Sequence, residues 1–268
     1  MMLTKNMIDN CKILFQLHIP NLLTYYTEKE FLTLLENLYS FTLLHDGKTA
    51  NSNFVATFLM LVEEVKNNNS QELRNELGYF NYLLGEFEKV KKNKEFKNLV
   101  KGVINNFEKN DFKNVLAEIA VCLHLSTRAE LVKYERVLEN KKSIDFEFKD
   151  DQNNLFLVEV YNIDYNSTKY EIGKPFEKFI CERLEKKFND KSTNLDNEHK
   201  SRLLIFPVIH GLTIDIVREN KLFLTTLNKK RFYENGFNSF NPMSFAKVQG
   251  TYFDLFTMEE IAVGELKR

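Results

Sequence analysis

The chain has 268 residues, of which 43% are hydrophobic and 13% aromatic, and this apolar content excludes a globally disordered protein. The length allows one large domain or two domains of roughly 100–200 residues each. The net charge is −1, from 37 basic and 38 acidic residues, which argues against a protein that coats long nucleic acid and leaves only a local patch for such contact.

Cysteine and histidine spacing gives no sign of a disulfide framework or a zinc site. The cysteines are odd in number and far apart, and the histidines are not at helix or finger spacing. Among these residues are Cys11, Cys122, Cys181, His124, His199 and His210. No run reaches the ~18 apolar residues of a membrane span, and charges interrupt residues 1–15, so we expect a cytoplasmic protein without a membrane segment.

Helical periodicity dominates the first part of the chain. Thr27 and Glu30 have the spacing of a capping box, in which each side chain bonds the main-chain N–H of the other residue. An apolar stripe follows over residues 31–38, and similar stripes recur further along at 54–65, 73–87 and 99–107. We therefore predict a helical domain over residues 1–110, which would serve to recognise a protein partner or a substrate.

From residue 111 the pattern changes to an α/β order, and we predict a second domain over residues 111–268. Its expected elements are a helix at 111–125, strands at 131–134, 144–148 and 155–163, a helix at 175–188, a loop at 187–200 and a strand at 203–210. In the tail we expect a short helix at 214–219, with edge strands or loops at 222–227 and 252–256. The fold class is α+β or α/β, with a mixed sheet flanked by helices.

Two acidic residues are predicted to face each other within the sheet. Residues 155–163 are almost continuously apolar, as in a buried central strand, and Glu159 interrupts them. If the hairpin pairs symmetrically about Gln152 in the polar turn, Asp145 lies opposite Glu159 with Cβ atoms ~5 Å apart. Two carboxylates that close repel each other, and a bound divalent cation would remove the repulsion. The pair therefore predicts a metal site.

Other interpretations of these acids remain open. Glu118 interrupts an apolar helix and either points at the same cluster or is an ordinary residue on the helix surface. Asp145 and Glu159 are alternatively two ordinary strand residues, with Glu159 paired to a lysine from a helix. The basic run at 229–231 lies beside Phe232 and Tyr233, which suits nucleic-acid contact, although such a charge run is more often a solvated loop.

The order of these elements resembles the PD-(D/E)XK nuclease superfamily, which has the restriction-endonuclease-like fold. The resemblance covers residues 111–210: a helix with Ala117 and Glu118, a strand, then Asp145 on a second strand and Glu159 on a third. It implies that Asp145 and Glu159 bind Mg²⁺, that Glu118 is a further ligand, and that a lysine two residues after the second acid helps to activate water.

The sequence departs from this family pattern at two positions. Ile144 stands where a proline is expected, and Tyr161 stands where the lysine is expected. A tyrosine with a pKa near 10 is a poor general base at neutral pH. Three possibilities remain: metal alone activates the water, the site is inactive, or a lysine comes from elsewhere. Candidates for that lysine are Lys141, Lys142 and Lys178.

Three functions follow from these predictions. The first is metal-dependent phosphodiester hydrolysis of DNA or RNA with Mg²⁺ or Mn²⁺, in which Glu118, Asp145, Glu159 and Tyr161 form the site. The second is an inactive module of the same fold that binds nucleic acid or a protein partner. The third is a helical interaction protein with an unrelated α/β domain.

Overall fold

The structure is a computed structural model, and it describes residues 10–44, 78, 81–86, 99–101, 112–165, 175–212, 214–226, 243–248 and 251–257. The chain divides into two compact units, Met1–Ile119 and Ala120–Arg268. The boundary falls within a helix rather than near residue 110, where we expected it. Each unit is described by itself.

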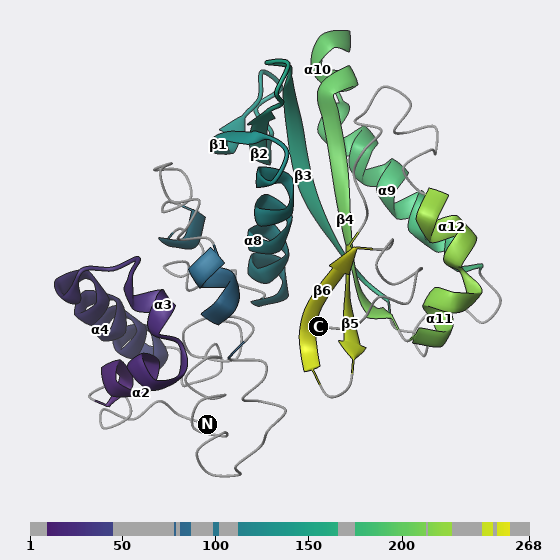
Figure 1. The fold of residues 1–268 in the computed structure, drawn as a ribbon. Coiled ribbons are helices and arrows are strands. Elements are labelled where there is room, and N and C mark those ends of the chain that lie inside the picture. Colours follow the sequence, from purple (N-terminus) through teal and green to yellow (C-terminus); the bar gives the residue numbers. More distant parts are fainter. Residues whose placement is uncertain are drawn as a thin grey trace. The chain divides into compact units, whose positions relative to one another are not determined.

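The described residues of the first unit are helical. They comprise helices α2 (Cys11–His18), α3 (Pro20–Leu23) and α4 (Glu28–Leu44), together with helical residues at 81–86 and 99–101 (Figure 1). Tyr25 is fully buried and donates its phenolic O–H to the Leu84 carbonyl at 2.8 Å. Asn21 donates two further hydrogen bonds to Asn81, from its main-chain N–H to the side-chain oxygen and from its side-chain amide to the main-chain carbonyl. Contacts of this kind join helices that are about 60 residues apart in the chain.

The predicted capping box is present at the start of α4. The Glu30 N–H donates to Thr27 Oγ1 at 3.3 Å, and the Thr27 N–H donates to Glu30 Oε2 at 2.7 Å. These reciprocal bonds satisfy main-chain N–H groups that a helix start leaves without partners. Behind the cap, Phe31, Leu34 and Leu35 are buried at helical spacing. The predicted helix start is therefore confirmed.

The second unit is built on a mixed sheet with the strand order β1-β2-β3-β4-β5-β6. Pairing is antiparallel from β1 to β3, parallel from β3 to β4 and from β4 to β5, and antiparallel between β5 and β6. The strands are β1 (Glu130–Val137), β2 (Ser143–Lys149), β3 (Leu155–Asp164), β4 (Leu203–Leu212), β5 (Met243–Val248) and β6 (Thr251–Thr257). A sheet of this kind with helices confirms the α+β class.

Helices on both faces of the sheet complete the second unit. Helix α8 (Phe112–Ser126) precedes β1, and its His124 ring packs on the Phe206 ring of β4 at 6.2 Å. Helix α9 (Phe176–Ser192) connects β3 to the parallel strand β4. The remaining helices, α10 (Asn197–Arg202), α11 (Ile214–Glu219) and α12 (Lys221–Thr226), are short. Within the described ranges, no helix has the length and apolar character that crossing a membrane requires.

Two predicted segments differ from the structure. Most of the expected loop at 187–200 is helical, because α9 continues to Ser192 and α10 begins at Asn197, where Asp196 caps it by accepting the His199 N–H. Residues 222–226 are part of helix α12 rather than an edge strand or loop, and Phe223 and Leu224 are buried there. A short apolar run fits a strand or a buried helix equally well, so periodicity alone did not decide.

Candidate active site

The β2–β3 hairpin brings Asp145 and Glu159 together. The paired residues run from Lys149 opposite Leu155 to Phe146 opposite Val158, which is the register symmetric about Gln152. One further step in this register places Asp145 opposite Glu159 on the same face of the sheet. We refer to these two residues as the carboxylate pair.

The charges of the two residues in the carboxylate pair repel each other. Asp145 Oδ2 accepts the Val160 N–H at 2.7 Å, which favours the charged form. Burial nevertheless raises the pKa of Asp145 to about 7, and the neighbouring Glu159 charge contributes to the rise. Asp145 therefore keeps its proton to a much higher pH than an ordinary aspartate, as expected for a second carboxyl beside a buried carboxylate.

Two lysines from α9 contact the buried Glu159, which is only 4% exposed. Lys187 Nζ lies 2.8 Å from Oε1, and Lys191 Nζ lies 3.0 Å from Oε2. Glu159 is thus paired to helix lysines, as one of the alternative interpretations foresaw. We refer to Lys187 and Lys191 as the lysine pair. Two carboxyls and two ammonium groups consequently meet on one face of the sheet.

The lysine pair continues the buried stripe of α9. Phe176, Ile180 and Leu184 are buried at helical spacing. Position 187 comes three residues after Leu184, and position 191 comes four residues after position 187. A lysine at a core-facing position of an amphipathic helix needs an acidic partner. This spacing is the signal in the sequence that could have identified both residues.

The three candidates for a lysine from elsewhere do not contact Glu159 in the structure. Lys141 and Lys178 are exposed. Lys142 Nζ pairs with Asp190 Oδ1 at 2.7 Å. The cations beside Glu159 are therefore supplied by residues that were not among the candidates, although Lys178 lies on the same helix.

A turn between β1 and β2 fixes the end of α9 that carries Lys191. Asn140 Nδ2 donates to the carbonyls of Lys191 and Thr193, at 3.0 and 2.8 Å. In return, Lys191 Nζ donates to the Ser143 carbonyl at 2.5 Å. Lys191 is thus held against β2 through both its main chain and its side chain.

Tyr161 lies beside Lys187, one residue of the lysine pair. Strand alternation places its ring on the same face as Glu159, and Lys187 Nζ lies 5.3 Å from the ring centroid. Burial lowers the pKa of Lys187, but Glu159, then Asp145 and Tyr161, outweigh it, and the pKa is above its ordinary value. Lys187 is therefore a permanent cation at neutral pH and not a proton acceptor.

Glu118, the third expected ligand, lies on α8 within the first unit and is half-buried. The part of α8 in the second unit packs His124 on Phe206. Phe206 pairs with Val160, so it lies on the face of the sheet opposite Glu159. The assignment of Glu118 as a metal ligand stays a prediction.

The carboxylate pair has the oxygen donors that Mg²⁺ and Mn²⁺ prefer. Glu159 Oε2 is buried and accepts no hydrogen bond from the residues that the structure describes, although Lys191 lies at ion-pair distance. The lone pairs of Glu159 Oε2 can therefore accept a further cation beside Asp145, the carboxyl with the raised pKa. The oxygens of the carboxylate pair are therefore donors of the type that a hard divalent ion takes, and on Glu159 such an ion would share them with Lys187 and Lys191.

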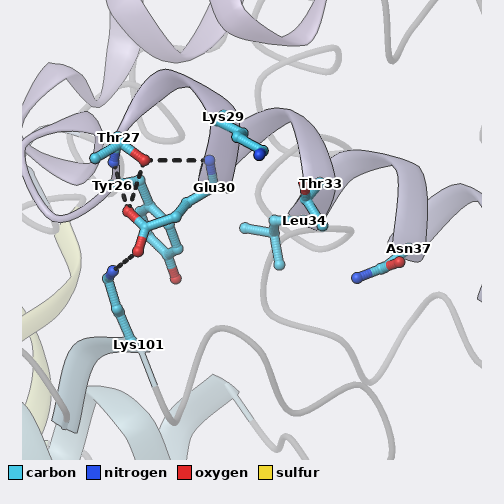
Figure 2. A pocket seen from close by; sticks show the side chains of 8 residues that line it. All are labelled: Tyr26, Thr27, Lys29, Glu30, Thr33, Leu34, Asn37 and Lys101. Carbon is cyan, nitrogen blue, oxygen red and sulfur yellow. Dashed lines mark hydrogen bonds and ion pairs between the residues drawn. The ribbon is translucent and has the colours of Figure 1, made fainter.

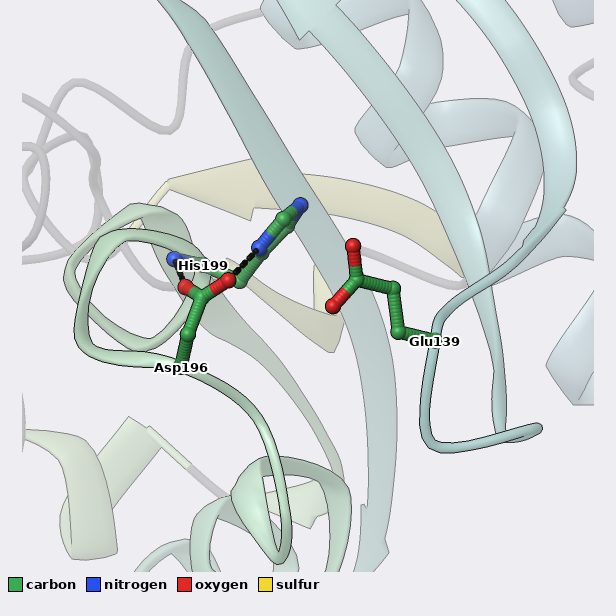
Figure 3. Close-up of side chains that lie close together, drawn as sticks. All are labelled: Glu139, Asp196 and His199. Carbon is green, nitrogen blue, oxygen red and sulfur yellow. Dashed lines mark hydrogen bonds and ion pairs between the residues drawn. The ribbon is translucent and has the colours of Figure 1, made fainter.

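A second group of possible metal ligands lies on the surface. Glu139, Asp196 and His199 bring one ligand atom each to within 4.8 Å of one another (Figure 3). Asp196 already accepts the His199 N–H at 2.7 Å and contacts His199 Nδ1 at 2.8 Å. Sequence spacing did not predict this surface cluster, because Glu139 comes from a distant turn. The role of Asp196 as the cap of α10 accounts for its contacts with His199 without a metal.

The first unit carries a hollow of about 420 Å³ at the start of α4 (Figure 2). Glu30 pairs there with Lys101 at 2.5 Å, and this contact, with the bonds from Thr27, lowers the pKa of Glu30 to about 2. The other lining residues are Tyr26, Lys29, Thr33, Leu34 and Asn37. A carboxylate with so low a pKa stays charged at neutral pH, so Glu30 does not act as a general acid there.

The basic run at 229–231, with Phe232 and Tyr233, lies outside the described residues.

Comparison with protein-family models, with curated proteins and with solved structures found no match to the chain. The geometry of the carboxylate pair and the lysine pair is therefore the basis on which a function can be proposed.

Proposed function

We propose that the protein hydrolyses phosphodiester bonds in nucleic acid with Mg²⁺ or Mn²⁺ bound at the carboxylate pair, as a nuclease of the PD-(D/E)XK type. One observation carries this proposal: Asp145, with a pKa raised to about 7, lies beside Glu159 where two lysines supply positive charge. Raised pKa values beside a specific charged partner are typical of functional sites.

The order of elements in the second unit supports the family resemblance. A helix is followed by three antiparallel strands, a crossover helix and a strand parallel to the third. The acids lie on the second and third of these strands, where the resemblance requires them. This order is the reason for preferring a restriction-endonuclease-like core to an unrelated α+β domain.

A purely structural ion-pair cluster is the competing explanation. In such a cluster each carboxylate is stabilised by its partners, and its pKa falls. The ammonium groups of Lys191 and Lys187 do act on Asp145 in this direction, yet burial and Glu159 outweigh them. A raised pKa beside a specific charged partner is more common at functional sites than in clusters that only stabilise the fold.

The residues would divide the chemistry as follows. Asp145 and Glu159 would hold the metal, which when bound lowers the pKa of a coordinated water and offsets charge at phosphorus. The water oxygen bonds to phosphorus as the bond to the leaving oxygen breaks, giving a phosphate monoester and an alcohol. The water loses a proton to solvent, and the leaving oxygen takes one up. An ammonium group from the lysine pair would stabilise the negative charge that develops on the phosphate oxygens.

The test is digestion of single- and double-stranded DNA and RNA by the purified chain with Mg²⁺ or Mn²⁺. We expect cleavage that a chelator abolishes and that Asp145→Asn and Glu159→Gln each reduce at least about a hundredfold. Glu139→Gln, in the surface cluster, is the matched control and should retain full activity. Cleavage that survives both carboxylate substitutions would overturn the proposal.

The second candidate is an inactive module of the same fold. The observation that favours it is Tyr161 at the position of the family lysine. Its signature would be Mn²⁺ binding that depends on Asp145 and Glu159, together with nucleic-acid binding but no cleavage of any substrate. Metal binding and cleavage measured on the same preparation therefore separate the two functions.

A further inference from the structure

We propose that Tyr161 and Lys187 together replace the single lysine of the family pattern: the tyrosine ring positions the Lys187 ammonium, and that ammonium contacts the scissile phosphate. Lys191, in contrast, anchors Glu159 and does not contact substrate. This inference rests on the proposed function and assigns separate roles to residues of the same site.

The geometry of Lys187 carries the first step. Its Nζ lies 2.8 Å from Glu159 Oε1 and 5.3 Å from the centre of the Tyr161 ring. Tyr161 is two residues after Glu159 on β3, so both side chains lie on the face that α9 covers. The ammonium from the helix therefore lies over the side chain of the position where the family has its lysine. A cation over a tyrosine face is held there by the ring quadrupole.

The two lysines differ in what holds them and in their access to solvent. The side chain of Lys191 is 14% exposed and also donates to the Ser143 carbonyl at 2.5 Å. The Lys187 side chain is 26% exposed, and the described residues that its ammonium contacts are Glu159, through an ion pair, and the face of the Tyr161 ring. An ammonium has three donor positions. Lys187 therefore keeps donors for an incoming anion, whereas Lys191 uses its donors to hold β2 and β3 in place.

A phosphodiester is the anion that this arrangement suits. A partly exposed ammonium beside a pair of metal-binding carboxylates can donate to a non-bridging phosphate oxygen while the metal occupies the other side. The Tyr161 ring limits the directions in which the long lysine side chain can move, so less rotamer freedom is lost when substrate binds.

The decisive experiment moves the ammonium group from position 187 on α9 to position 161 on β3. We expect Lys187→Met to lower kcat/KM about a hundredfold, and Tyr161→Leu to lower it roughly tenfold because the ring no longer holds the ammonium. Tyr161→Phe keeps the ring and should recover most of what Tyr161→Leu loses. Combining Tyr161→Lys with Lys187→Met puts the cation back on β3 and should recover at least about tenfold over Lys187→Met alone. Lys178→Met, exposed on the same helix, is the control.

The combined variant can overturn the inference. If it binds Mn²⁺ like the wild type and melts cooperatively, yet is no more active than Lys187→Met, the two positions do not share one function. A second measurement keeps the inference testable if the wild type cleaves nothing and the proposed function fails. Fluorescence anisotropy of a labelled phosphorothioate oligonucleotide in Ca²⁺ should then show weaker binding for Lys187→Met and Tyr161→Leu than for Lys178→Met. Equal binding by all three variants would overturn it.

Discussion

Asp145 on β2 accepts a hydrogen bond at 2.7 Å from the main-chain N–H of Val160 on β3, just beyond the last paired residues of the hairpin. The side chain thus ties the two strands together where their ladder ends. It also holds the Asp145 carboxyl beside Glu159, so the same contact that completes the hairpin creates the repulsion between the two acids. The register of this hairpin therefore places two carboxyls where a bound cation would reduce the repulsion between them.

Metal binding should depend on the carboxylate pair and not on the surface cluster. We expect Asp145→Asn and Glu159→Gln each to weaken Mn²⁺ binding at least tenfold, because each removes a charged oxygen ligand. Titration calorimetry at neutral pH measures this directly. Glu139→Gln and His199→Ala are the matched controls and should leave the affinity within a factor of about two. Loss of binding in the controls alone would move the metal site to the surface cluster.

The raised pKa of Asp145 predicts an unusual dependence of stability on pH. The folded-state pKa is about 7, against an ordinary value of 3.8, so the folded protein holds a proton that the unfolded chain releases. Its contribution to stability is complete below about pH 4 and is lost as the pH rises to about 7. Asp145→Asn removes this loss and keeps an oxygen for the Val160 N–H.

Without metal, we therefore expect Asp145→Asn to be more stable than the wild type by on the order of 1–3 kcal/mol at pH 8, with a smaller difference at pH 5. Thermal melts in a chelator between pH 5 and 8 measure this. Added Mn²⁺ should stabilise the wild type and leave the variant nearly unaffected. Parallel melting curves across the pH range would show that Asp145 does not titrate there.

The part of the site within the hairpin could be predicted from the sequence. A polar turn centred on Gln152 and apolar residues on both sides fix the register, and the register alone places Asp145 opposite Glu159. The element order from the helix before β1 to β4 follows from local periodicity in the same way. These features depend on neighbours in the chain, which a sequence displays directly.

The source of the cations could not be predicted with the same reasoning. Lys187 and Lys191 reach Glu159 because of the way α9 packs across β3 and β4, and that packing depends on contacts between distant segments. The proximity of Glu139 to His199 has the same origin, since a β-turn and a short helix meet only in the folded chain. The end of α9 was misjudged because its last turns are rich in charged residues and resemble a loop in composition.

The capping box of α4 predicts a change in stability without a change in catalysis. Thr27→Ala removes the acceptor of the Glu30 N–H and should destabilise the protein by about 1 kcal/mol. Thr24→Ala is a suitable control, because the Thr24 hydroxyl donates only to the Asn21 carbonyl at an exposed site. Chemical denaturation gives both values, and kcat should be the same for the two variants. A kcat that falls only in Thr27→Ala would connect the first unit to catalysis.

Lys191 is the residue whose loss should disturb the cluster most without removing a carboxylate. Lys191→Met takes away one cation beside Glu159 and the bond to the Ser143 carbonyl, so we expect a loss of roughly 2 kcal/mol in stability. It should also raise the pKa of Asp145 further, because the Lys191 charge lowers that pKa in the wild type. Carbon NMR of the Asp145 carboxyl through a pH titration measures the second effect.

Lys142→Met is the matched comparison for Lys191→Met, because it removes an ammonium that pairs with the exposed Asp190 on the same helix. A surface pair of this kind contributes little, so we expect less than about 0.5 kcal/mol and no change in the pKa of Asp145. If the two methionine variants were equally stable and titrated alike, Lys191 would not act on the carboxylate pair. If only Lys191→Met raises the pKa of Asp145, the cation from α9 tunes the proton that the metal must displace.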